Sequence, residues 1–202
     1  MAYLGTMSGV KIANLALSHI GNSATIQSFT ESSTEANVCN LWYDFARLQV
    51  LESSDWNFAR KTALLAEHAD AVPDNWAYRY QRPADCVAVR KIVNPGGETL
   101  DAIPYRIENS LDGETETILT NLVTASVDYT FNATAVNLFS TTFITGLTYL
   151  IAHYIAMPLT GSDEIQDRML QRYAGFARVA QARNASEEVG LPPRESEWIR
   201  AR

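Results

Sequence analysis

Four carboxylates lie close together in the sequence, within and on both sides of a Leu-Asp-Gly turn at residues 111–113. Acidic side chains gathered in this way can serve a hydrolase as general acid and base, or they can face a cation or an internal channel. They can equally form a solvated loop without a chemical role. The four residues are Glu108, Asp112, Glu114 and Glu116.

Histidine is another residue type suited to proton transfer. His19, His68 and His153 fall in three separate predicted elements, and nothing in the sequence brings them together. The chain contains no GxxxxGK(S/T), GxGxxG, GxSxG or HExxH motif, so no phosphate cradle, nucleophilic serine or zinc site is indicated. We therefore expect no enzyme activity, no cofactor and no bound metal, with a small hydrolase as the alternative.

Composition and charge further limit the kinds of protein that this chain can be. The 202 residues suit one domain, residues 1–202, and the 47% of hydrophobic residues is typical of a globular protein. A formal net charge of −7 argues against a protein that coats DNA or binds an anionic membrane, because both need a basic surface. Cys39 and Cys86 lie outside any CxxC or Cys–His spacing, which predicts two free, buried thiols.

The segment from Tyr129 to Ser162 contains no charged residue. Within it, residues 138–159 are long enough to cross a bilayer, but they include several hydroxyl side chains, His153 and Pro158. No basic cluster flanks the segment, so the usual orientation signal is missing. The pattern predicts a helix buried in the core or at a subunit interface, and no membrane contact.

Helical spacing occurs at both ends of the chain. The first helix is predicted from the N-cap Ser8 to Gly21. A second starts at a capping box formed by Ser32 and Glu35 and runs to about Glu52, with apolar residues on more than one face, which indicates packing between partners. Helical spacing returns from about Asn137, and a final helix follows the cap at residues 162–163 and ends at Gly190.

The middle of the chain has short β-prone runs separated by turn formers. Tyr78 and Tyr80 alternate with Arg79, which predicts a strand with one solvated face. The expected strands lie at residues 63–66, 76–82, 86–93, 101–107, 115–121 and 124–132, with a hairpin turn at 111–113.

The order of these elements predicts an α+β fold. We expect a helical bundle formed by the N- and C-terminal helices, residues 8–56 and 137–190, with an antiparallel β lobe inserted at residues 57–136. An extended C-terminal tail, residues 191–202, follows a Pro-Pro break and is too short and polar to build its own core. Its apolar and basic residues are therefore the predicted anchor for another chain, namely Leu191, Trp198, Ile199, Arg200 and Arg202.

A series of segments, taken in order, resembles the phage tail tubular protein A family. The opening stretch is Ile12 to Gly21, followed by a loop and helix cap at residues 26–29 and 31–36. The most distinctive piece is Trp76-Ala77-Tyr78-Arg79-Tyr80 followed by Pro83-Ala84-Asp85-Cys86. The remaining matches are residues 43–47, Leu51, residues 55–59, residues 150–152 and the Ala-rich final helix.

The resemblance implies a structural virion protein of a short-tailed phage, without catalysis or cofactor. Proteins of this family are head-to-tail adaptors, so the expected partners are other copies of the chain in a dodecameric ring, the portal protein and the tail nozzle protein. Genomic DNA would pass through the ring during ejection without specific binding. The expected location is the virion tail at the portal vertex, after synthesis in the host cytoplasm. Another ring-forming part, such as a head-completion or tail-terminator protein, is the alternative.

Overall fold

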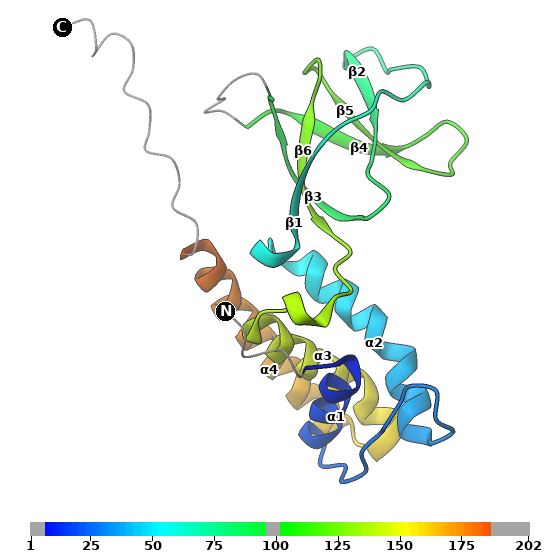
Figure 1. Cartoon of the computed structure of the whole chain (residues 1–202), viewed down its shortest axis with the longest axis vertical. Coiled ribbons are helices and arrows are strands. Elements are labelled where there is room, and N and C mark those ends of the chain that lie inside the picture. The colour runs from blue at the N-terminus through cyan, green and yellow to red at the C-terminus, as the bar shows by residue number, and fades with distance from the viewer. Residues whose placement is uncertain (1–6, 96–101, 187–202) are drawn as a thin grey trace, which may run out of the picture. The chain divides into compact units, whose positions relative to one another are not determined.

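The computed structural model describes residues 7–95 and 102–186, with side chains as far as Ala177 (Figure 1). These residues form an α+β fold with four α-helices, two 3₁₀ turns and six strands. The helical elements are α1 (Gly9–His19), α2 (Thr34–Ser53), η1 (Asn57–Ala59), η2 (Val136–Leu138), α3 (Thr141–Thr160) and α4 (Asp163–Ser186). The strands are β1 (Arg60–Leu64), β2 (Tyr78–Gln81), β3 (Cys86–Val93), β4 (Tyr105–Asn109), β5 (Glu116–Thr120) and β6 (Ser126–Phe131).

The described chain divides into two compact units. The first, the helical unit, contains all four α-helices and covers residues up to 61, 85–88 and 130–184. The second, the β unit, covers residues 62–84 and 89–129. The divisions fall inside β1, β3 and β6, so these three strands belong partly to each unit.

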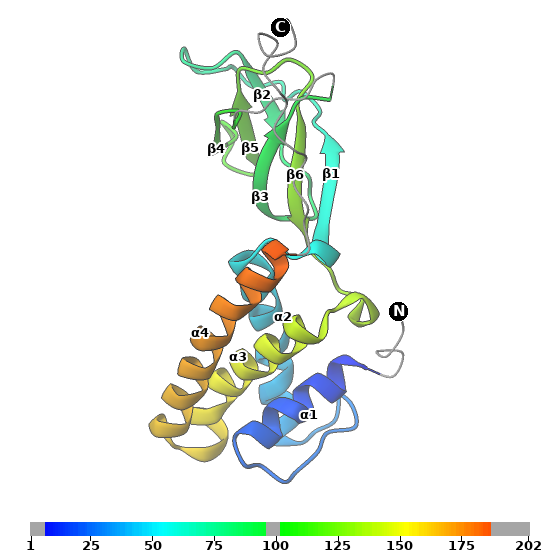
Figure 2. The same cartoon turned by 90° about the vertical axis from the view of Figure 1, so that its left-hand side faces the viewer.

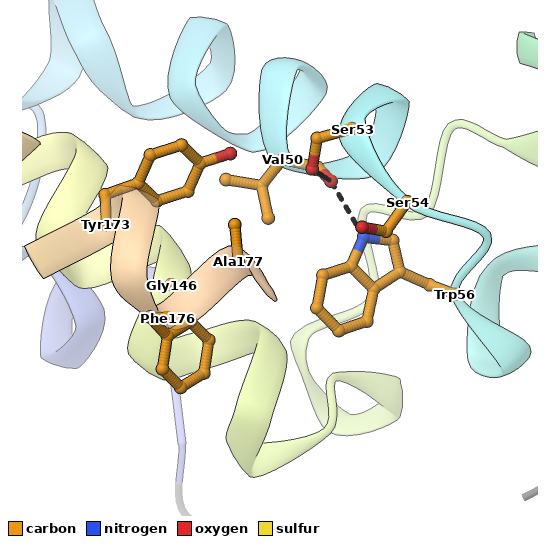
Figure 3. A pocket seen from close by; sticks show the side chains of 8 residues that line it. All are labelled: Val50, Ser53, Ser54, Trp56, Gly146, Tyr173, Phe176 and Ala177. Carbon is orange, nitrogen blue, oxygen red and sulfur yellow. Dashed lines mark hydrogen bonds between the residues drawn. The ribbon is translucent and has the colours of Figure 1, made fainter. Parts of the chain in front are cut away.

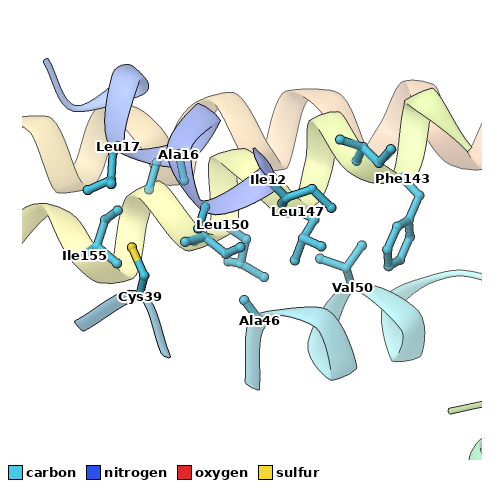
Figure 4. Close-up of a cluster of buried hydrophobic side chains, with 14 of the residues drawn as sticks. Ile12, Ala16, Leu17, Cys39, Ala46, Val50, Phe143, Leu147, Leu150 and Ile155 are labelled. Carbon is cyan, nitrogen blue, oxygen red and sulfur yellow. The ribbon is translucent and has the colours of Figure 1, made fainter. Parts of the chain in front are cut away.

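Helix α3 is the centre of the helical unit, with α1, α2 and α4 packed around it (Figure 2). Its residues Phe143, Leu147, Leu150 and Ile155 meet apolar side chains of α1 and α2 in one cluster (Figure 4). Gly146 lets α4 approach closely, because a Cβ there would lie 3.2 Å from ring carbons of Phe176. This encirclement explains why α3 carries no charged residue.

By length and composition α3 is also apolar enough to cross a membrane, with a mean hydropathy of 1.3 over its most apolar window. In the structure, 56% of that window is buried inside the protein. Packing of α3 against α1, α2 and α4 therefore explains why its sequence is apolar.

The caps of the first two helices show how local sequence positions them. Ser8 caps α1 by accepting a hydrogen bond from the Lys11 amide, as predicted, and Gly21 follows the helix with a φ of +78°. The capping box predicted for α2 was wrong by one residue. Ser33, not Ser32, is the N-cap and accepts from the Ala36 amide.

The reason for this shift is the side chain of Glu31. Its carboxylate accepts hydrogen bonds from the Ser33 hydroxyl and from the backbone amides of Gln27 and Ser28. The loop before α2 is thus organised around Glu31, and Glu35 does not close a box with the N-cap.

The start of α3 was also predicted too early. Residues 136–138 form the 3₁₀ turn η2, and α3 begins at Thr141, where the Ser140 hydroxyl accepts from the Phe143 amide. Gly161 ends α3 in the left-handed region, and Ser162 caps α4 through the Ile165 amide, as expected. The predicted end of this helix at Gly190 lies outside the described residues.

The strands of the described chain form two three-stranded sheets, ordered β1-β6-β3 and β2-β5-β4. In the second sheet β5 pairs antiparallel with both neighbours, so that Ile118 lies opposite Tyr80 and Ile107. The predicted turn between β4 and β5 is confirmed, since Gly113 has a φ of +75° and the Ser110 amide bonds to the Thr115 carbonyl. The first strand lies at Arg60–Leu64 rather than at residues 63–66.

The solvated face predicted for β2 was wrong, because Arg79 is buried beside Tyr80. Its guanidinium donates to the Glu108 carboxylate at 2.7 Å, to the Thr117 hydroxyl at 2.9 Å and to the Ala71 carbonyl at 3.1 Å. Arg79 therefore links neighbouring strands through its hydrogen bonds. The alternation of side chains along the sequence does not reveal such contacts.

A second buried arginine, Arg47, ties α2 to the segment that follows β6. Only 4% of Arg47 is exposed. Its Nη1 donates to Asn132 Oδ1 at 2.7 Å and to the Ala133 carbonyl at 2.8 Å, and its Nε donates to Asp44 at 3.1 Å. The only basic residue of α2 is therefore turned inward.

Candidate functional site

The carboxylates around the β4–β5 turn are largely occupied by structural partners. Glu108 pairs with the buried Arg79, with Arg79 Nη2 2.7 Å from Glu108 Oε1. Glu116 pairs with Arg82, which directly follows the neighbouring strand β2. Both acids therefore hold strands of one sheet together.

Asp112 organises the turn itself. It accepts hydrogen bonds from the Ser110 hydroxyl and the Glu114 amide, and these bonds hold the pKa of the Asp112 carboxyl below its usual range. Among the described residues, no group of three or more His, Cys, Asp or Glu side chains is arranged to hold a metal ion. Three of the carboxylates thus have structural roles, because Glu108 and Glu116 link strands and Asp112 shapes the turn.

The three histidines occupy different environments. His19 packs against Tyr149 with ring centroids 4.8 Å apart, and burial, together with the nearby Arg172, lowers its pKa. His153 Nδ1 lies 3.0 Å from the Gln166 carbonyl, and His68 Nδ1 accepts from the Asp70 amide. Each histidine is thus explained by its own packing or hydrogen bond.

Both cysteines are free, as predicted, but only one is fully buried. Cys39 lies in the core of the helical unit, and burial raises the pKa of its thiol to about 11. Cys86 is half-buried, which corrects the expectation that both thiols are buried. The difference arises because Cys86 begins the strand β3, whereas Cys39 lies in the middle of a core face.

The predicted tail anchor cannot be placed, because Leu191, Trp198, Ile199, Arg200 and Arg202 lie outside the described residues. The described residues show a different candidate for partner binding, on the surface of the helical unit.

We call this surface the aromatic patch. It consists of Leu41, Trp42 and Phe45 from α2 and Tyr154 and Met157 from α3. Trp42 and Tyr154 stack with centroids 4.7 Å apart and planes 9° from parallel, and Phe45 packs edge-on against both rings. The Tyr154 hydroxyl donates to Gln49 Oε1 at 2.6 Å, which fixes the orientation of the stack.

Large parts of the aromatic patch face solvent. Leu41 is 68% exposed, Phe45 53% and Met157 48%. Single exposed apolar residues are ordinary, but a contiguous group with stacked aromatic rings is typical of protein-binding surfaces. Tyr, Trp and Phe are enriched in such interfaces because they offer large rigid areas at low entropic cost.

The charged side chains on the outer side of α2 are all acidic. They are Glu35, Asp44 and Glu52, while the helix's single basic residue, Arg47, points inward. The side chain of Asp44, next to Phe45 in sequence, is 77% exposed. Asp44 beside the aromatic patch pairs with Arg47, whose Nε lies 3.1 Å from Asp44 Oδ1.

A small cavity lies elsewhere in the helical unit, where α2, α3 and α4 meet (Figure 3). Its volume is about 10 Å³, room for about one water, and its lining includes Val50, Trp56 and Phe176. The Trp56 indole points its Nε1–H to the Val50 carbonyl at 2.7 Å. The cavity is too small for a substrate and is a packing gap between helices.

The aromatic patch was not singled out from the sequence, although a signal was present. The apolar residues of the second helix covered more than one face, which indicated packing between partners. In the structure one face, including Cys39, Ala46 and Val50, enters the core, and the other face, with Leu41 and Phe45, is exposed. The excess of apolar faces was therefore the sequence signal for this exposed apolar surface.

Comparison with known proteins adds no family, since no protein-family model and no curated protein matches this sequence.

Proposed function

We propose that the chain is a structural virion protein, a head-to-tail adaptor (tail tubular) subunit that forms a ring between the portal and the tail nozzle. The observation that carries the proposal is the aromatic patch, an exposed apolar surface on a fully formed helical unit. Such a surface is suited to binding protein. The adaptor class comes from the ordered resemblance to the tail tubular protein A family.

The proposal includes the finer architecture and the partners. The four helices are taken as the bundle of the adaptor, the β unit as its inserted lobe, and residues 191–202 as an extended tail that anchors another chain. The partners are other copies in a dodecameric ring, the portal protein and the nozzle protein, in the virion tail and away from any membrane. An isolated subunit of a ring needs apolar area beyond its own core, and the aromatic patch supplies such area.

The net charge supports the same role. With −7 overall, the ring would repel phosphates and let DNA pass through its centre without sticking. A cationic chain would bind the genome that it has to release.

A related ring part, such as a head-completion or tail-terminator protein, is the second candidate, because it would need the same kind of exposed surface. The position of the protein in an imaged particle distinguishes these roles. The hydrolase alternative receives no support from the described carboxylates, since Glu108 and Glu116 are paired with arginines.

The test is the mass of the purified protein by light scattering, with negative-stain images of the same fraction. We expect a ring with an open centre, either from the protein alone or after purified portal is added, because a symmetric template can supply the interface. A chain that stays monomeric and does not bind portal would overturn the proposal.

A matched pair of variants links the assembly to the aromatic patch. Phe45→Ser should reduce ring formation or portal binding, because it removes an exposed aromatic without disturbing the core. Leu64→Ser is the control, since Leu64 is 64% exposed and lies on β1, so it is not part of the patch. Equal assembly of both variants would exclude the patch as the contact surface.

A further inference from the structure

The β4–β5 turn contains a pair of residues with a chemistry of its own, Asp112 followed by Gly113. It is the only Asp-Gly step in the sequence, and no Asn-Gly step occurs. At such a step the backbone nitrogen of the glycine can attack the side-chain carboxyl carbon of the aspartate, because glycine has no Cβ to hinder the approach. Both residues are exposed, so water has access to the products.

The reaction rearranges the backbone without changing its composition. The Gly113 nitrogen forms a bond to Asp112 Cγ, and the carboxyl hydroxyl leaves as water with the amide proton, which gives a cyclic succinimide. Water then adds to one of the two ring carbonyls and breaks its bond to the nitrogen. Opening at the former backbone carbonyl leaves the chain running through the aspartate side chain, as an isoaspartate, whereas opening at Cγ restores the aspartate.

The folded turn holds both reacting groups in other interactions. The Gly113 amide donates to the Ser110 carbonyl at 2.9 Å, so its proton is engaged. Asp112 Oδ1 accepts from the Ser110 hydroxyl, and also from the Glu114 amide at 2.9 Å. These bonds favour the charged carboxylate and lower the pKa of Asp112. Because the leaving water needs a protonated carboxyl, the lower pKa slows the reaction at neutral pH.

Ser110 is the residue that connects the two sides of the turn. Its hydroxyl accepts from the Thr115 amide at 3.1 Å while donating to Asp112, and its own amide donates to the Thr115 carbonyl at 2.7 Å. Ser110 is 5% exposed, whereas the residues of the turn that follow it are exposed. The Leu111 amide adds a bond to Asp70 Oδ2, outside the turn, at 2.7 Å. The turn must therefore open before its Asp-Gly step can react.

We infer that the Asp112–Gly113 step is a latent site of isoaspartate formation, which the bonds made by Ser110 keep unreactive while the β4–β5 turn is closed. Local openings need less free energy than unfolding of the whole chain, so opening of this turn alone controls the reaction. An isoaspartate adds the Asp112 Cβ to the main chain and moves the carboxylate away from its donors. The modified chain cannot remake the native turn. The inference goes beyond the proposed function and does not depend on it.

The test incubates the full-length chain in water enriched in ¹⁸O. Each passage through the succinimide places one heavy oxygen at residue 112, which mass spectrometry detects after digestion in ordinary water, and chromatography separates the aspartate and isoaspartate peptides. A synthetic peptide of residues 108–116 is the unfolded reference. We expect labelling of the folded chain to be slower than that of the peptide by about tenfold or more, because hydrogen bonds to a charged group hold the turn closed. Equal rates would overturn the inference.

A set of variants assigns the protection to Ser110. Ser110→Ala should raise the labelling rate about tenfold, because it removes the bond from the hydroxyl to Asp112. Glu114→Gln is the matched control and should leave the rate unchanged, because the Glu114 amide still donates. Ser33→Ala weakens the α2 cap in the helical unit, so it controls for a general loss of stability and should also leave the rate unchanged. Equal rates in the Ser110→Ala and Glu114→Gln proteins would overturn the inference.

Asp70→Ala tests the opening of the turn without touching Ser110. It removes the acceptor of the Leu111 amide and leaves the bonds to Asp112 in place. A step that reacts only after the turn opens should also be labelled faster in this variant. An unchanged rate in Asp70→Ala would overturn the control of the reaction by turn opening, and this variant serves as well if Ser110→Ala does not fold.

Discussion

Arg47 makes buried polar contacts that hold the helical unit together. Replacing it with Met should lower the free energy of unfolding by about 2–4 kcal/mol, because the Ala133 carbonyl and the Asn132 side chain would lose their donor in a site that is 4% exposed. Urea unfolding followed by circular dichroism measures this loss.

The matched control changes Asp44, the exposed ion-pair partner of Arg47. Asp44→Asn should change the free energy of unfolding by less than about 1 kcal/mol, since the Asp44 side chain is 77% exposed and its ion pair is screened by water. A larger effect from Asp44→Asn than from Arg47→Met would show that the buried bonds do not carry the stability.

His19 makes a residue-scale contribution to pH dependence. Its folded pKa lies below the ordinary value of 6.5, through burial and through the nearby Arg172. Above pH 6.5 the side chain is neutral in both states and has no effect. As the pH falls below 6.5 the unfolded chain binds the proton first, so stability declines until the pH reaches the lowered folded pKa.

The measurement is the midpoint of thermal unfolding between pH 7.5 and 5. His19→Gln should flatten the decline below pH 6.5, because glutamine does not titrate. A variant whose midpoint falls as steeply as that of the unchanged protein would contradict this role of His19.

At the scale of elements, the N-cap of α2 allows a direct comparison of neighbouring serines. Ser33→Ala should destabilise the protein by about 1 kcal/mol, since the Ser33 hydroxyl satisfies the Ala36 amide. Ser32→Ala should change stability by less than about 0.5 kcal/mol, because Ser32 is exposed and is not the N-cap. The reverse order in thermal unfolding would place the cap where the sequence pattern first suggested it.

Local sequence patterns predicted most helices and strands. They did not predict the side-chain contacts that determine where these elements begin and end. Helix α1, the strand β3 and the β4–β5 turn follow from Ser8, from the apolar run at residues 86–93 and from Gly113. The α2 cap was misplaced because Glu31 bonds Ser33 from outside the box pattern, a side-chain contact that spacing does not encode. Arg79 shows the same limit, because its partners Glu108 and Thr117 come from other strands.

The candidate site was harder to predict from the sequence than the fold. Apolar residues on a second face of α2 indicated a partner, but the stack of Trp42 on Tyr154 needs α3 to lie beside α2. That pairing joins residues more than a hundred positions apart, and no periodicity predicts it.

For the molecule as a whole, the charge of −7 predicts that the protein does not retain DNA. Non-specific DNA-binding proteins bind with Kd values of roughly 10⁻⁴–10⁻⁶ M through counterion release, which needs clustered cations. We expect no binding of a fluorescent duplex at about 100 µM protein, even at low salt. Micromolar binding that weakens steeply with salt would contradict the proposal that DNA passes through the ring without being bound.

The central position of α3 also has a consequence for how the chain is made. About a hundred residues separate the end of α2 from the end of α3, and a ribosome takes roughly 5–20 s to add them. During this interval α1 and α2 are without the helix that covers their inner faces, and Leu41 and Phe45 on the outer face of α2 are uncovered as well. We therefore expect the emerging N-terminal part to bind chaperones, and slow or interrupted translation beyond residue 53 should favour its aggregation.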